Sequence, residues 1–130
     1  MKVKRDGSIS DLDKMKLRIK LTENEFEMFI LVLQTYNSYL TFTKIERIND
    51  TRFKNLLARI REYDKVDFRI LFMKAKKSDF LNGRSGEKWR ANFDFLFSKR
   101  GFLKVLEGNY DNIASEKSAL QNAILNIYSK

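Results

Sequence analysis

The chain of 130 residues contains no cysteine, no histidine and no proline. The absence of cysteine excludes disulfides, thiolate nucleophiles and thiolate metal sites, and it fits a cytoplasmic protein. The absence of histidine removes the usual general base near neutral pH and the commonest metal ligand. We therefore expect a protein that is not an enzyme, has no catalytic residue and uses no cofactor or metal.

Long apolar runs are missing as well. No stretch approaches the roughly 18 apolar residues that cross a bilayer. The basic start, MKVKRDGSIS, lacks the apolar segment of a secretory signal. Apolar residues still make up 43% of the chain, which is enough for one hydrophobic core at this length. We expect a single cytoplasmic domain with no membrane partner.

The net charge of +9 is unevenly spread along the chain. Residues 51–107 carry fifteen basic and seven acidic side chains, whereas residues 21–50 have a net charge of −3. A basic block beside an acidic segment indicates a surface that faces a polyanion such as DNA. A solvated, lysine-rich surface is the plainer interpretation, because many small soluble domains have one.

The N-terminal region has two expected parts. Residues 1–14 are polar and contain Gly7, so we expect a mobile basic arm. Residues 15–21, MKLRIKL, alternate apolar and basic side chains, a pattern typical of a strand. The segment 40–48 is rich in β-forming residues and is a candidate partner. A small two-stranded element near the N-terminus is therefore expected.

The remaining chain shows helical periodicity, so the fold class is mainly α: a single compact domain of about five helices over residues 15–130. Thr22 and Glu25 form a capping box at the first helix start. The final helix packs within the chain or pairs with a second copy. The expected helices cover residues 22–36, 49–63, 64–77, the stretch between Gly101 and Gly108, and about 112–129.

The helix at 64–77 has an unusually wide apolar face. Val66, Ile70 and Met73 share one side, and four further apolar residues of the helix extend it. We expect this helix to be the most buried of the set.

The segment 78–97, SDFLNGRSGEKWRANFDFLF, contains two glycines and a lysine, so it is a candidate for a loop that binds the phosphates of a nucleotide. A Walker A loop requires the pattern G-x-x-x-x-G-K-[ST] between a strand and a helix. Here Gly83 and Gly86 are only three residues apart, Lys88 is not adjacent to Gly86, and Trp89 occupies the place of the hydroxyl. This spacing excludes a Walker A loop, so we interpret the segment as a helix–loop–helix connector with a basic edge.

A metal-dependent nuclease would need converging carboxylates. The candidates, Asp64, Asp67, Asp79 and Asp94, stand near helix starts, where caps explain them better. No acidic residue has a lysine two positions later, a pairing that many nucleases use.

The candidate nucleic-acid site combines nine basic residues with one aromatic residue. Lysine and arginine neutralise phosphates, and Trp89 is a candidate for stacking on a base. Core packing is the alternative for Trp89, and it is the expectation for Phe93, Phe95 and Phe97. The basic residues, called the 74–104 basic block below, are Lys74, Lys76, Lys77, Arg84, Lys88, Arg90, Lys99, Arg100 and Lys104.

Several short motifs stand out between residues 36 and 112. Each is weak alone, but as a set they are quite specific. The motifs are Tyr36-Asn37, Thr51-Arg52-Phe53-Lys54, Ala58-Arg59, Ser78-Asp79-Phe80-Leu81-Asn82-Gly83, Trp89, Ala91-Asn92-Phe93-Asp94, Phe102, and the run from Lys104 to Asn112.

This set resembles the C-terminal domain of bacteriophage and prophage replication proteins of the replisome-organiser or replication-initiator type. The resemblance implies a role in mobile-element DNA replication, with contacts to DNA or to a replicative helicase or its loader. The family usually has tryptophan at Phe95 and often proline near 98–101. Its members also carry an N-terminal winged-helix domain, for which the roughly 35 residues before the match are too few. Origin-specific DNA binding is therefore not implied.

Three functions are weighed. The first is a non-enzymatic DNA-binding accessory protein of phage or mobile-element replication, with single- or double-stranded DNA as partner. The alternative is a protein-interaction module that binds or inhibits a host machine, such as a helicase loader or a nucleoprotein defence complex. Such a module would contact its partner through Glu23, Glu25, Glu27 and the terminal helix. The third is a nuclease with acidic metal ligands.

Overall fold

The structure, a computed structural model, describes residues 1–86 and 88–112. The mainly α, compact fold that we expected is confirmed, and the described residues contain six helices and no strand. The expected helix at about 112–129 lies outside the described residues. The helices are α1 (Asp11–Lys20), α2 (Glu23–Tyr39), α3 (Asp50–Glu62), α4 (Lys65–Lys77), α5 (Phe93–Leu96) and α6 (Lys99–Leu106).

Side-chain caps explain where these helices begin. Thr22 and Glu25 form the expected capping box at α2, and Asp64 and Asp67 form a second one at α4. Asn49, Asn92 and Ser98 cap the remaining core helices in the same way. Among the described helices, none combines the length and apolarity needed to cross a membrane.

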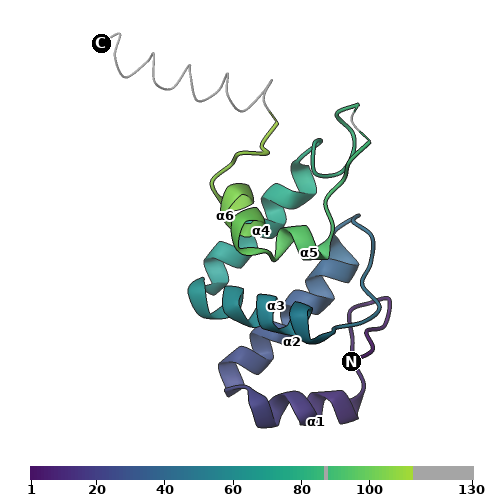
Figure 1. The fold of residues 1–130 in the computed structure, drawn as a ribbon, viewed down its shortest axis with the longest axis vertical. Helices are drawn as coiled ribbons and strands as arrows, with labels where there is room; N and C mark the ends of the chain where they lie inside the picture. Colours follow the sequence, from purple (N-terminus) through teal and green to yellow (C-terminus); the bar gives the residue numbers. More distant parts are fainter. Residues whose placement is uncertain (87, 113–130) are drawn as a thin grey trace, which may run out of the picture.

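Helix α2 runs along the length of the molecule, with α1 across one end and α6 toward the other (Figure 1). It contacts α1, α3 and α4, while α6 packs against α3, α4 and α5. The 40–48 link and the N-terminal segment lie beside the C-terminal part of α2 (Figure 1). This arrangement leaves the connector between α4 and α5 at the α6 end.

Aromatic rings fill the core between these helices. Tyr36 packs edge-on against Phe93 with 5.2 Å between ring centroids, and its hydroxyl donates a hydrogen bond to the Thr43 carbonyl. Burial raises the pKa of Tyr36 well above its ordinary value. Phe97 and Phe102, both buried, extend the ring network toward α4 and α6. Phe93 and Phe97, two of the three phenylalanines that we expected in the core, are therefore core residues.

The first ten residues differ from the mobile arm that we expected. The amide of Val3 donates to the Glu46 carbonyl at 2.8 Å, and Val3 and Ile9 are buried. The buried side chain of Asn37 donates to the carbonyls of Lys4 and Ile45, each at 3.0 Å. The segment therefore packs against the fold through two apolar side chains and a hydrogen bond from α2.

Residues 11–20 form helix α1, so the strand expected at 15–21 is wrong. Ser10 caps the helix, and only Leu17 in it is buried. Met15 and Ile19, which the alternating pattern placed on the same face as Leu17, are 64% and 86% exposed. Two isolated bridges, between Lys2 and Arg47 and between Val3 and Ile9, stand in place of the small sheet.

Helix α4 buries a narrower face than we expected. Val66, Ile70 and Met73 are exposed. The buried residues of this helix are Phe68, Leu71, Phe72 and Ala75.

Candidate nucleic-acid interface

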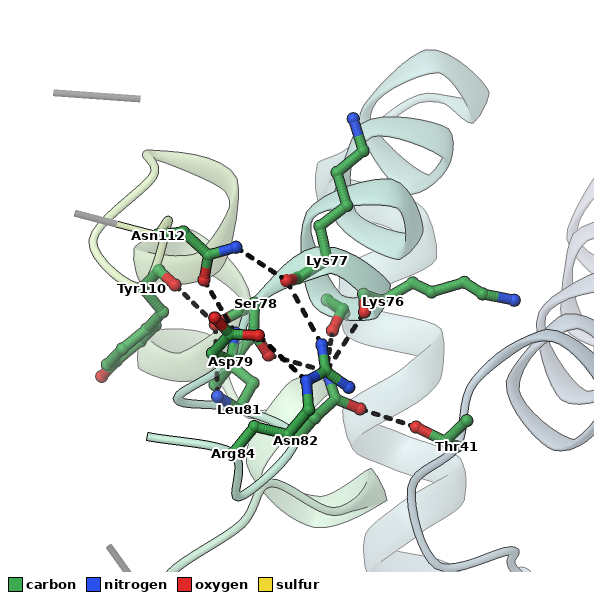
Figure 2. Close-up of polar contacts among 11 residues, drawn as sticks. Thr41, Lys76, Lys77, Ser78, Asp79, Leu81, Asn82, Arg84, Tyr110 and Asn112 are labelled. Carbon is green, nitrogen blue, oxygen red and sulfur yellow. Dashed lines mark hydrogen bonds and ion pairs between the residues drawn. The ribbon is translucent and has the colours of Figure 1, made fainter. Parts of the chain in front are cut away.

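The basic residues at the end of α4 diverge from one another. Lys74 forms an ion pair with Asp111 at 2.8 Å, and Lys76 donates to the Tyr39 carbonyl at 2.9 Å on the side of α2. The Lys77 side chain is exposed and extends away from that of Lys76 (Figure 2). Of these three, Lys77 is the one that a phosphate reaches without displacing another contact.

The connector carries three further members of the block. Arg84 pairs with Asp79 at 2.9 Å and also donates to the Lys77 carbonyl at 3.4 Å, so it braces the connector (Figure 2). Lys88 and Arg90 are exposed on either side of Trp89. Neither forms an ion pair with any described carboxylate.

Helix α6 carries the last three residues of the 74–104 basic block. Lys99 and Arg100 are exposed in its first turn, whereas Lys104 is half-buried in its last turn. The helix dipole disfavours cations at an N-terminus, and no acidic residue offsets Lys99 and Arg100 in that turn. This placement costs the free protein stability and would favour a bound anion there.

Trp89 belongs to a separate cluster of four rings. Its centroid lies 5.2 Å from that of Phe80 and 5.0 Å from that of Phe95, and Tyr110 closes the cluster by stacking on Phe80. Trp89 remains 40% exposed. The ring is thus held in place by its neighbours and still accessible, instead of lying in the main core.

Two of the sequence motifs, residues 78–83 and 104–112, meet in a polar junction (Figure 2). The Asn82 amide group donates to the carbonyls of Ala75 and Ser78 at 2.8 and 2.7 Å, which satisfies the end of α4. Asn112 accepts from the Asp79 amide at 2.8 Å and donates to the Lys77 carbonyl at 3.0 Å. These motif residues therefore connect the segment after α6 to the end of α4.

The four candidate carboxylates have other partners. Asp64 and Asp67 cap α4, Asp79 pairs with Arg84, and Asp94 pairs with Arg52 through two hydrogen bonds of 2.9 and 3.0 Å. The hydrogen bond from Arg52 holds the pKa of Asp94 below its ordinary value. In residues 1–86 and 88–112, no three acidic side chains are grouped to hold a metal ion.

One of the three glutamates near the start of α2 also has partners within the fold. Glu25 closes the capping box and pairs with Arg61 at 2.7 Å, and that contact lowers the pKa of Glu25. Glu23 and Glu27 are exposed.

Sequence reasoning missed a second basic cluster. The bridge between Lys2 and Arg47 brings the N-terminus against the 40–48 link. Lys4 and Arg5 border the same hollow of about 630 Å³, and Asp13 and Glu46 also line it. Arg47 lies in the segment whose net charge is negative, so the charge pattern along the chain hid this grouping.

Comparisons of the chain with protein-family models, with curated proteins and with solved structures found no match. The resemblance to phage replication proteins therefore stays a prediction.

Proposed function

We propose that the protein is a non-enzymatic DNA-binding accessory of phage or mobile-element DNA replication. One observation carries the DNA-binding part: five members of the 74–104 basic block are exposed, and their charged groups form neither an ion pair nor a hydrogen bond with a described residue, whereas the exposed Lys76 donates to the Tyr39 carbonyl. Phosphates would release counterions on meeting these side chains, which gives affinity without sequence specificity. The five residues are Lys77, Lys88, Arg90, Lys99 and Arg100.

Trp89 supports single-stranded DNA over duplex DNA as the preferred partner. It stands between Lys88 and Arg90, is partly exposed, and is fixed by Phe80 and Phe95. Cations beside an accessible ring suit a backbone tracked by charge with bases stacked on an aromatic face. The replication role rests on the family resemblance alone.

The single tryptophan allows a direct test, because all indole fluorescence comes from the proposed site. Titration with single-stranded oligonucleotides should quench Trp89, and raising the salt concentration should reverse the quenching. Duplex DNA of equal length should quench it less. Unchanged fluorescence together with unchanged anisotropy of labelled DNA at low salt would reject the proposal.

A further inference from the structure

An apolar groove of about 410 Å³ lies between α2 and α4, apart from the DNA-binding residues proposed above. The α2 residues recur every three or four positions, so they form one stripe along the helix. A second stripe on α4 forms the opposite wall. The lining residues are Met28, Leu31, Val32, Thr35, Tyr39, Lys65, Phe68, Arg69 and Phe72.

Part of this apolar surface is open to solvent. Leu31 is 42% exposed and Tyr39 is 39% exposed, although both are large apolar side chains. Phe68 and Phe72 close the floor of the groove and are buried. An apolar wall on α2 and a closed floor of buried rings match the shape that receives the apolar edge of a helix.

The charge around the groove is one-sided. Lys65 and Arg69 line the α4 wall, and Lys76 sits 3.9 Å above the Tyr39 ring at one end. None of the three forms an ion pair with a described carboxylate. On the α2 side, exposed Glu27 precedes the lining residue Met28. A ligand seated here meets cations along one flank only.

We propose that the groove binds an amphipathic helix of a partner protein. The helix would place leucine-like side chains between the two walls and a row of Asp or Glu along the flank that faces α4. Electrostatic complementarity with Lys65 and Arg69 would set its orientation. The chain's own residues 113–130 fit less well, since they contain one glutamate and two lysines. This binding is independent of the proposed DNA contacts.

The four methionines allow a site-resolved test. Met28 lies in the groove, whereas Met1, Met15 and Met73 are not among its lining residues. The probe is a synthetic amphipathic peptide of about 18 residues, long enough to form a helix. It carries leucines on one face and glutamates on one flank. In protein labelled with ¹³C at the methionine methyls, the Met28 signal should shift and the other three should not.

Two variants test which apolar contact and which charge the peptide uses. Leu31→Glu should abolish the Met28 shift, and its exposed position keeps the core intact, which a thermal melt checks. Arg69→Glu should weaken binding several-fold. The same variant should instead bind a matched peptide with lysines on that flank. A lysine-flanked peptide that binds the unaltered protein equally well would overturn the charge argument.

Other occupants give distinct outcomes, each of which overturns the proposal. A Met28 signal that moves on dilution without peptide indicates a second copy in the groove. A Met28 signal that moves in the 130-residue Ile124→Glu/Ile127→Glu variant without peptide indicates the chain's own C-terminal segment. A shift at Met73 instead of Met28 places the peptide on the other face of α4, and no shift at about millimolar peptide rejects the site.

Discussion

The hydroxyl of Thr41 donates a hydrogen bond of 2.7 Å to the side-chain oxygen of Asn82, across 41 residues of chain. Thr41 follows α2, and Asn82 follows α4 and satisfies the carbonyls at its end. One buried amide therefore connects the ends of two helices and fixes where the connector begins.

Asn82→Ala should destabilise the fold by about 2–3 kcal/mol, because it removes the donor to the Ala75 carbonyl and the acceptor of the Thr41 hydroxyl. The matched control is Asn109→Ala, since Asn109 is exposed and its side chain has no hydrogen bond among the described residues. The control should cost less than about 0.5 kcal/mol. Urea denaturation measures both, and equal losses would show that the cap does not matter.

Gly7→Ala tests whether the N-terminal segment is packed. Gly7 has φ of +86°, and an added Cβ would lie 2.3 Å from the Leu33 carbonyl oxygen. Gly86 has a similar φ of +89°, but a Cβ there meets nothing within 4 Å. The free energy of unfolding should fall by about 3 kcal/mol or more for Gly7→Ala and about 1 kcal/mol for Gly86→Ala. A mobile segment would tolerate both changes equally.

Periodicity and caps were enough to predict α2, α3 and α4, the three longest helices among the described residues, because Thr22, Asn49 and Asp64 act on neighbouring amides. Local patterns failed where burial depends on distant segments. Leu17 and Leu21 are buried four residues apart, yet the exposed apolar residues Met15 and Ile19 made the run look like a strand. Packing of Val3 against the 40–48 link is non-local, so polar composition alone suggested a mobile arm.

The candidate site was only partly predictable. Charge along the chain located the basic block, but it did not show that Lys74 and Arg84 have acidic partners. The four-ring cluster around Trp89 combines residues from three segments, so no single stretch indicated it. The cluster of Lys2 with Arg47 was hidden for the same reason.

Charge reversal at Lys99 and Arg100 should have opposite effects on stability and on binding. Glutamate in the first turn of α6 interacts favourably with the helix dipole, so Lys99→Glu/Arg100→Glu should raise the free energy of unfolding by about 1 kcal/mol. The same variant should bind DNA more weakly. Thermal melts and anisotropy measure the two effects, and a destabilised variant would show that α6 does not begin at Lys99.

The control for charge is Lys16→Glu/Lys54→Glu, which changes the net charge equally on α1 and α3. Both side chains are exposed and form no ion pair with described carboxylates. At about 0.15 M salt the Debye length is roughly 8 Å, so distant charges affect binding weakly. This control should keep most of its DNA affinity.

The most direct test of the DNA-binding claim is the salt dependence of affinity, measured by anisotropy of a labelled single-stranded oligonucleotide. The unaltered protein should show a steep linear fall of log K with log salt. Lys88→Glu/Arg90→Glu should weaken binding at every salt concentration and flatten the slope by about one to two, since roughly 0.7 counterions are released per contact on single strands. An unchanged slope in this variant, or no binding by the unaltered protein at low salt, would contradict the account.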